Sequence, residues 1–445
     1  MRPIGIDLFA GAGGLSLGFE QAGFDVVGAV EIDPIHAAIH AFNFPNCAIL
    51  PRSVEGLTGA ALRKATGIGK RRVDVVFGGA PCQGFSLIGH RVLDDSRNAL
   101  VREFVRIVGE LQASYFVFEN VKGLTVGKHR AFLEELIAAF DTIGYQVRLP
   151  WCVLDAADYG VPQHRERLFL YGARKGLPLP EYPAKLSSPA DNEWSSQPKG
   201  PTCRDALGDI PDADRFDALL ESDEVRPGRW REMSAYAREM RCLTNDAWHY
   251  GYIREWNPAV LTSSTRTHHT DISRSRFAAT APGQVEPISR FFRLDGKGLS
   301  NTLRAGTDAA RGAFTSPRPI HYALPRCVTV REMARLHGFP DWFRFHATKW
   351  HGARQIGNSV PPPLARAVAG ALMKALGVEA TRPPEKIALG DPALIGMVMS
   401  GASEYFGIEN PIARRDRKSG AKKRKQHEIE ALRHVARKEF AIVGN

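Results

Sequence analysis

Closely spaced cysteines are missing from this chain of 445 residues. Its six cysteines are scattered, and no two of them form a C-x-x-C pair. A structural zinc site or a disulfide framework needs cysteines at short, regular spacings, so we expect neither, and we expect no metal. Scattered thiols are typical of a reducing compartment, and we expect the cytoplasm.

The chain also lacks long apolar stretches, and it has fewer acidic than basic residues. No apolar run approaches the ~18 residues that a membrane-spanning helix needs, and no signal-peptide pattern precedes the first strand-like segment. The 48 Asp and Glu are outnumbered by 59 Lys and Arg, which gives a net charge of +11. We therefore expect no membrane partner. The basic surplus favours nucleic acid as a partner, although a basic solvated surface fits it equally well.

The first part of the chain alternates between strand and helix patterns. The segment 98–111, for example, places its apolar residues on one helical face. Alternation of this kind is typical of an α/β fold with a mostly parallel sheet and helices on both of its faces. We expect strands at 4–9, 25–31, 73–77, 115–118, 145–154 and 167–171, and helices at 15–22, 34–43, 98–111 and around 132–140.

The rest of the chain divides into three parts. From about 176 to 325 prolines and charges replace clear periodicity, which predicts a smaller, loop-rich domain. Regular patterns return with a short helix at 329–336 and a longer one at 363–376. Beyond about 380 lies a tail whose basic run at 414–425 is typical of a solvated, flexible segment.

A glycine-rich loop, Phe9 to Gly14, follows the first strand. Its spacing falls short of the dinucleotide-binding fingerprint, because Ser16 stands where the third glycine is required. Glu31 ends the second strand, where a carboxylate can accept both hydroxyls of a ribose. The alternative for Glu31 is a carboxylate that stabilises a helix N-terminus. These residues alone leave NAD or another adenosine-bearing ligand open.

Cys82 stands in a second glycine-flanked loop, Gly78 to Ser86, directly after the strand at 73–77. Strand ends in an open α/β sheet present reactive groups, whereas structural cysteines are more often buried in apolar runs. Position alone leaves both a nucleophile and a structural thiol open. Three further polar clusters stand at strand or helix edges, and each by itself would pass as a cap or a surface ion pair: 119–121, 163–167 and 355–361.

Taken together and in this order, these segments resemble the motifs of the cytosine-5 DNA methyltransferases. The matching segments are DLFAGAGG at 7–14, GGAPCQGFS at 78–86, ENV at 119–121, QHRER at 163–167, REMARLHGFP at 331–340 and QIGNSVPP at 355–362. The resemblance implies the Rossmann-like, mostly parallel sheet of class I S-adenosylmethionine-dependent methyltransferases with a smaller, loop-rich target-recognition domain. The implied parts are a catalytic and cofactor-binding domain at 1–175 completed by 350–378, a target-recognition domain at 176–349, and a basic C-terminal extension at 379–445.

The resemblance also implies DNA cytosine-5 methylation and assigns roles to residues. Carbon 5 of cytosine is a poor nucleophile until a thiolate adds to carbon 6, and Cys82 is implied as that thiolate. Glu119 is implied as the proton donor to ring nitrogen 3. Arg165 and Arg167 both offer forked donors, and the resemblance implies that one of them, Arg167, holds the ring carbonyl. The sequence departs from the family near Arg52, where an acidic residue often contacts the adenine amino group. S-adenosylmethionine is implied as the methyl donor, without a metal, bound by Phe9, Gly11, Gly13, Gly14, Glu31, Pro81, Leu100, Asn358 and Ser359.

A paired cytosine must leave the double helix before a protein side chain can attack it. The loop that carries the cysteine is therefore expected to close over double-stranded DNA, with Gln83, Ser86 and Arg91 in contact with it. In the recognition domain we expect Arg304 to contact DNA and Gln284 to fill the vacated space. By resemblance we expect a bacterial monomer that modifies host DNA alongside a restriction endonuclease, as a functional but not a physical partner.

Three other functions stay open at this point. An RNA methylase would use the same chemistry, and competition between duplex DNA and structured RNA as methyl acceptors separates the two. A non-catalytic nucleic-acid-binding module would form no covalent complex with DNA that contains 5-fluorocytosine. A nicotinamide oxidoreductase would bind NAD, and the missing third glycine argues against it. The insertion at 176–325 and the basic charge favour duplex DNA.

Overall fold

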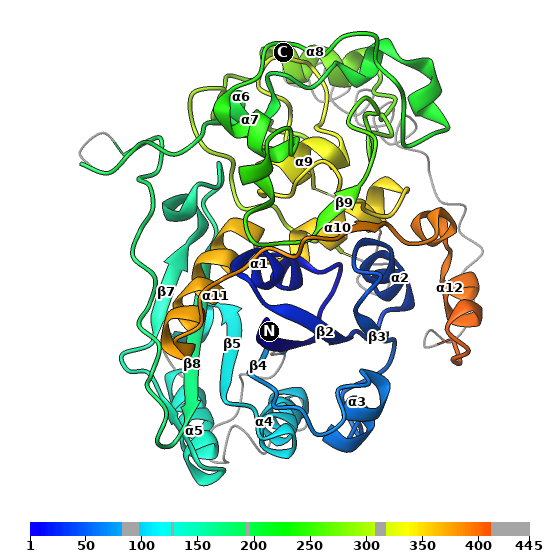
Figure 1. The fold of residues 1–445 in the computed structure, drawn as a ribbon. Helices are drawn as coiled ribbons and strands as arrows, with labels where there is room; N and C mark the ends of the chain where they lie inside the picture. The colour runs from blue at the N-terminus through cyan, green and yellow to red at the C-terminus, as the bar shows by residue number, and fades with distance from the viewer. Residues whose placement is uncertain (82–97, 126–128, 193–195, 308–316, 411–445) are drawn as a thin grey trace, which may run out of the picture.

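The computed structural model describes residues 1–81, 98–125, 129–192, 196–307 and 317–410. In Figure 1 a sheet surrounded by helices forms the lower body, and short helices joined by loops form the upper part. The strands of the body are β1 (Ile4–Leu8), β2 (Asp25–Val30), β3 (Ala48–Leu50), β4 (Val75–Gly78), β5 (Tyr115–Val121), β6 (Tyr145–Val147), β7 (Cys152–Asp155) and β8 (Glu166–Arg174). They lie in the order β3-β2-β1-β4-β5-β8-β6, and β7 also pairs with β8.

The sheet is parallel from β3 to β5 and turns antiparallel at β8. Both β6 and β7 pair with β8 in the antiparallel sense. Separate hydrophobic clusters lie on the two faces of the sheet, so each face is covered by helices. One face carries α1 (Gly14–Ala22), α2 (Pro34–Asn43) and α11 (Pro362–Leu376), and the other carries α3 (Gly59–Ala65), α4 (Ala99–Leu111) and α5 (His129–Thr142). The predicted α/β fold with a mostly parallel sheet is confirmed.

Several elements differ from the sequence-based expectation. The single strand expected at 145–154 is two strands, β6 and β7, because Pro150 between them has no N–H to donate to a ladder. Two short elements, β3 and α3, were not predicted, since three strand residues and two helical turns carry little periodicity. Residues 355–358, expected as a loop before the last helix, form the last turn of a helix of their own, α10 (Lys349–Asn358).

The upper part, where the sequence analysis expected a loop-rich domain, contains several short helices. They are α6 (Cys203–Leu207), α7 (Ala235–Met240), α8 (Asp271–Ala279) and α9 (Val330–Leu336). A short strand of this part, β9 (Ile253–Glu255), pairs in parallel with β10 (Lys386–Ala388), which follows the last helix of the body. The chain beyond α11 therefore returns to the upper part and then reaches α12 (Met399–Tyr405) beside α2 (Figure 1).

A buried ion pair between Arg254 and Glu20 connects the upper part to the body. Arg254, in β9, donates from two nitrogens to the carboxylate of Glu20 in α1, at 2.8 and 2.7 Å. Both side chains are buried, so removing either one would leave an uncompensated charge in the interior.

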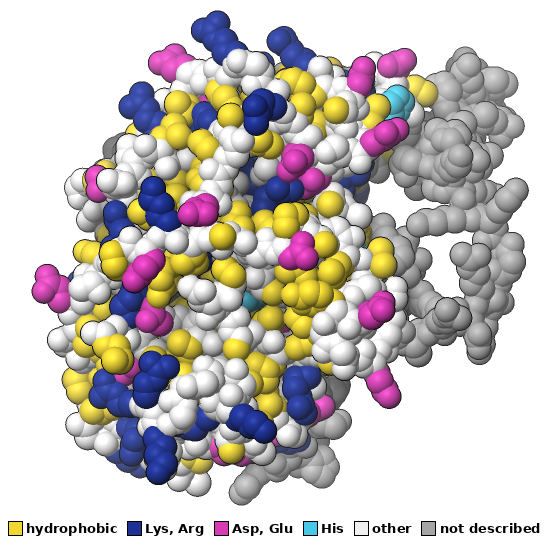
Figure 2. All heavy atoms as spheres, turned by 45° about the vertical axis from the view of Figure 1, so that its right-hand side comes forward, with side chains coloured by type: hydrophobic (Ala, Val, Ile, Leu, Met, Phe, Trp, Pro, Cys, Tyr) yellow, Lys and Arg dark blue, Asp and Glu magenta, His cyan; other side chains and the backbone are white. Residues whose placement is uncertain are grey.

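Basic side chains are spread over the molecule. In Figure 2 Lys and Arg gather toward the lower edge of the face shown and are interspersed with Asp and Glu above it. The positive surplus is thus not confined to the upper part. Among the described residues, no helix is both long enough and apolar enough to cross a membrane.

Candidate active site

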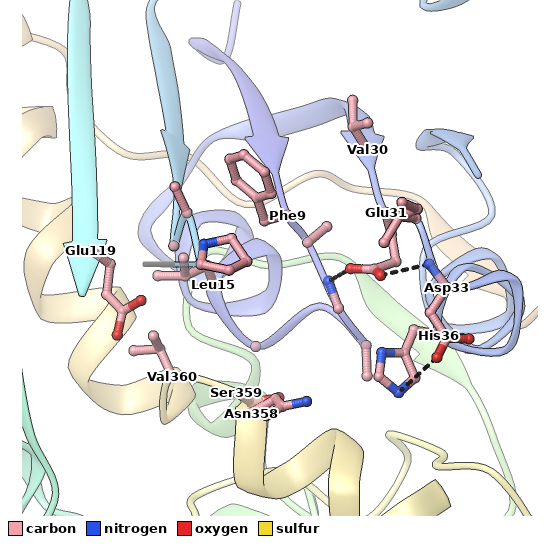
Figure 3. Close-up of a pocket in the computed structure, with 18 of the residues that line it drawn as sticks. Phe9, Leu15, Val30, Glu31, Asp33, His36, Glu119, Asn358, Ser359 and Val360 are labelled. Carbon is pink, nitrogen blue, oxygen red and sulfur yellow. Dashed lines mark hydrogen bonds and ion pairs between the residues drawn. The ribbon is translucent and has the colours of Figure 1, made fainter. Parts of the chain in front are cut away.

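A cavity of about 580 Å³ opens at the carboxyl ends of the parallel strands. Ligands of open α/β sheets bind at this edge. Eight of the nine residues predicted to bind the cofactor line it: Phe9, Gly11, Gly14, Glu31, Pro81, Leu100, Asn358 and Ser359. Figure 3 shows Glu31 at one side of this cavity and Glu119 at the other, with Phe9 and Leu15 between them.

Gly13 has a different place from the other predicted residues. It is the N-cap of α1, with a positive φ of 103°, and a Cβ added there would lie 2.4 Å from the ring of Phe44. It does not line the cavity. Its role is to let the glycine loop turn closely over α2.

Glu31 is held by backbone groups on both sides. Its two carboxylate oxygens accept from the N–H groups of Gly11 and Asp33, each at 2.8 Å (Figure 3). Burial raises the pKa of this carboxyl. The helix-capping role belongs instead to Asp33, whose side chain accepts from Ile35 and His36 at the start of α2. Glu31 is therefore fixed as an acceptor at the cavity wall, where the hydroxyls of a ribose would fit.

The opposite end of the cavity carries an ion pair between neighbouring strands. Arg167 Nε in β8 lies 2.9 Å from Glu119 Oε1 in β5. The antiparallel register places Glu119 opposite Phe169, so Arg167 is its diagonal neighbour on the same face of the sheet. Burial raises the pKa of the Glu119 carboxyl, and the positive charges of Arg167 and Arg165 oppose this shift. The pair offers an acid with a raised pKa beside a fixed cation.

Arg165 lies behind this pair. Its side chain is buried, and its two terminal nitrogens donate to the carbonyls of Leu303 at 2.9 Å and Gly357 at 2.8 Å. Arg165, directly before β8, therefore joins the start of this strand to the segment before Arg304 and to the last turn of α10. Of the two predicted arginines, Arg167 lines the cavity and Arg165 does not.

The loop that leads to Cys82 packs directly on Glu119. A Cβ on Gly79 would lie 2.3 Å from Glu119 Oε2, and Asn120 Nδ2 donates to the carbonyl of Ala80 at 2.9 Å. This contact fixes the loop up to Pro81. The predicted nucleophile and the predicted DNA contacts of the same loop lie outside the described residues: Cys82, Gln83, Ser86 and Arg91.

The two other predicted DNA contacts are exposed. Arg304 follows Leu303, whose N–H donates to the side chain of Gln163. Gln284 stands in a turn after Gly283, which has a positive φ of 76°. Arg304 is thus connected, through its neighbour Leu303, to the segment that precedes β8, whereas Gln284 belongs to a turn of the upper part.

Sequence reasoning missed several cavity residues. His36, Arg354 and Gln355 line the cavity but were not predicted to do so. His36 lies in the first turn of the helix after Glu31, and Arg354 stands four residues before Asn358. Recognition of α10 as a helix would have placed Arg354 and Asn358 on one face. Within the described ranges no group of three His, Cys, Asp or Glu side chains is arranged to hold a metal.

Comparison with protein families gives one match over most of the chain. The model of the C-5 cytosine-specific DNA methylases matches residues 4–374. This range includes both ends of the cavity and the upper part.

Individual proteins are similar over nearly their whole length. The chain is 60% identical over 433 residues to the Type II methyltransferase M.XorII of Xanthomonas oryzae pv. oryzae, covering 97% of this chain and 99% of that one. It is 31% identical to the Type II methyltransferase M.AgeI of Thalassovita gelatinovora, over 83% of this chain and 99% of the other.

Two solved structures extend the comparison to the fold. One belongs to a protein assigned as a DNA modification methyltransferase encoded within an E. coli prophage, with a TM-score of 0.66, 33% identity, and coverage of 84% of this chain and 99% of that one. The other is the Dnmt2 methyltransferase of S. pombe, with a TM-score of 0.50, 16% identity, and coverage of 84% and 99%. At that identity the second likeness concerns the fold alone.

Proposed function

Because the chain belongs to the family of C-5 cytosine-specific DNA methylases, we propose that Cys82, Glu119 and Arg167 act together on carbon 5 of a cytosine in DNA. The chain is a DNA cytosine-5 methyltransferase. The observation that carries the residue assignment is the Glu119–Arg167 pair, which lies at one end of the cavity and touches the loop that leads to the cysteine.

S-adenosylmethionine is the methyl donor in this proposal, and the cavity fits it. The fixed carboxylate of Glu31 suits the hydroxyls of its ribose, and the glycine loop lets the backbone approach closely. Asn358 and Ser359 line the same cavity from α10. When bound, the cofactor supplies an electrophilic methyl group; the protein residues supply everything else in the reaction.

The chain's own residues activate the cytosine. The thiolate of Cys82 adds to carbon 6, which makes carbon 5 nucleophilic. Glu119, whose pKa is raised by burial, donates a proton to ring nitrogen 3 and so absorbs the negative charge that flows into the ring. Arg167 holds the ring carbonyl. After methyl transfer a base removes the proton from carbon 5, and the cysteine leaves as the ring double bond returns.

Duplex DNA is the substrate in this proposal. A flipped cytosine must enter the cavity, and residues 176–349 select the sequence that surrounds it. Arg165 supports the proposal that both parts of the protein act on the same DNA. Its side chain donates to the carbonyl of Leu303, just before Arg304, and so connects the start of β8 to the predicted recognition domain. The curated relatives are named as Type II methyltransferases, and we propose the same role here, as the modification enzyme of a restriction–modification system that acts as a monomer in the cytoplasm.

Bisulfite sequencing of DNA from cells that express the chain tests this function. We expect 5-methylcytosine at one position of a short recurring sequence, and none in cells that express Cys82→Ser at the same level. A competition assay between duplex DNA and structured RNA shows which nucleic acid accepts the methyl group. Methylation of RNA in preference to DNA, or full methylation by Cys82→Ser, would contradict the proposal.

A further inference from the structure

Two arginines line the cavity without a carboxylate partner. Among the described residues, Arg167 pairs with Glu119, but no ion pair or hydrogen bond joins the side chain of Arg52 or Arg354 to another group. The cavity also holds the carboxylates of Glu31 and Asp33. An unpaired guanidinium at a cavity wall is a ready partner for a ligand that carries negative charge.

Arg354 is held in place by an aromatic ring. It lies one helical turn before Asn358 in α10, so both side chains face the cavity. One turn earlier stands Trp350, whose ring centroid is 5.3 Å from the guanidinium carbon of Arg354. The indole N–H of Trp350 donates to the carbonyl of Thr307 at 3.2 Å. A ring stacked in this way restrains an arginine but leaves its N–H donors available.

The neighbouring Gln355 holds α10 against the segment before it. The residue is 1% exposed, and its Oε1 accepts from the N–H of His346 at 3.0 Å. Its Nε2 is buried and has no partner among the described residues, and because solvent does not reach this nitrogen, a ligand in the cavity does not reach it either. Of these two neighbours, Arg354 is therefore the one whose side-chain donors are available to a ligand.

We propose that Arg354 binds the α-carboxylate of the amino-acid part of S-adenosylmethionine. Glu31 suits the ribose, so the adenosine end of the cofactor belongs near β2, and Arg52 follows the adjacent strand β3. The amino-acid end then lies toward α10, where its carboxylate needs a cation. An arginine fork matches a carboxylate with two N–H donors. This inference rests on the proposed function.

Two ligands that differ only in the amino-acid part test the inference by equilibrium titration. S-adenosylhomocysteine carries the carboxylate, whereas 5′-methylthioadenosine keeps the adenosine and the sulfur but lacks it. We expect Arg354→Gln to weaken binding of S-adenosylhomocysteine by about 10- to 100-fold, as for a lost charged hydrogen bond, and to leave binding of 5′-methylthioadenosine unchanged. Retained binding of the smaller ligand also shows that the variant is folded.

Arg52→Gln is the matched control, because it removes the other arginine of the same cavity that has no carboxylate partner among the described residues. We expect it to change the two affinities by the same factor, if at all. An equal loss for both ligands in Arg354→Gln, or no loss for either, would overturn the inference, and so would a loss confined to duplex DNA binding, which would place the side chain on a phosphate. If the unaltered protein binds no S-adenosylhomocysteine, the proposed function itself fails.

Discussion

Glu119 has to meet two opposing demands. In the proposed mechanism it carries a proton to donate to the cytosine ring, yet it lies beside Arg167, whose charge favours the ionised form. Burial is the larger influence and raises the pKa of this carboxyl. Burial of the side chain, rather than the residue type, thus shifts this carboxyl toward its protonated form.

Replacing Glu119 by Gln removes the proton that can be transferred but keeps the shape of the side chain. We expect a fall in the methylation rate of roughly 10²- to 10⁴-fold with little change in DNA affinity. The rate of the unaltered enzyme should decline as pH rises through the raised pKa of Glu119, because only the protonated acid donates. Rates measured across pH check this. A decline of the same shape in Glu119→Gln would assign it to another group.

His164, which stands two residues before β8, lies between two carboxylates. Its Nδ1 is 2.7 Å from Asp155 and its Nε2 is 3.1 Å from Asp191. Both nitrogens must donate, so the ring is an imidazolium, and the hydrogen bond to Asp155 is the main reason that its pKa rises to about 9. This charge joins the QHRER segment to the loop that contains Asp191.

The stabilisation from His164 should therefore depend on pH. Because its pKa is raised on folding, the contribution is complete below the ordinary histidine pKa of ~6.5 and is lost as pH rises through about 9. The side chain is half exposed, so we expect His164→Gln to lower the free energy of unfolding by ~1 kcal/mol or less at pH 7. Denaturant unfolding from pH 6 to 10 measures this. A constant difference between the two proteins across that range would contradict it.

At the scale of elements, the bounds of a helix could be predicted most accurately where local residues mark its start and end. The helix at 34–43 has its predicted bounds because Pro34 begins it and Asp33 caps it. Helix α10 was missed because Gly352 and Gly357 weaken the helical signal. A Cβ on Gly357 would lie 2.3 Å from the backbone nitrogen of Ala305, so tertiary packing, which no local pattern reveals, requires this glycine.

The ion pair of the site could be predicted only in part. The motifs identified Glu119 and Arg167 as site residues, but their contact depends on β8 running antiparallel to β5. Alternation of strands and helices predicts parallel neighbours, and it contains no signal for this reversal. At Gly13 the motif predicts a ligand contact, and the structure adds a packing requirement that the motif does not reveal, a close turn against Phe44.

The contact between α1 and α11 makes a matched pair of glycine variants informative. A Cβ on Gly18 would lie 2.3 Å from the Cβ of Ala365, whereas one on Gly370 would meet nothing within 4 Å. We expect Gly18→Ala to lower the free energy of unfolding by ~1–3 kcal/mol, as overpacking does. Gly370→Ala should raise it by up to about 1 kcal/mol, because alanine favours a helix. Thermal or denaturant melts measure both, and equal effects would show that the helices are not packed this closely.

At the scale of the whole molecule, residues from distant parts of the chain build one cavity. Phe9 and Glu31 come from its start, Glu119 and Arg167 from its first half, and Asn358 from beyond the upper part. The sequence analysis predicted a body completed by the segment 350–378, and in the structure α11, within that segment, packs on α1. The return of residues 379–410 to pair with β9 could not be predicted, since three-residue strands leave no recognisable pattern.

The central claim is that Cys82 forms a transient bond to a flipped cytosine while Glu119 and Arg167 hold the ring. Duplex DNA with 5-fluorocytosine at the methylated position tests it, because the fluorine cannot leave as a proton does and the complex persists. After incubation with S-adenosylmethionine and proteolysis, mass spectrometry should find the DNA on the peptide that contains Cys82, with none in Cys82→Ser and slower formation in Glu119→Gln. Attachment to another residue, or an undiminished complex in Cys82→Ser, would contradict the account.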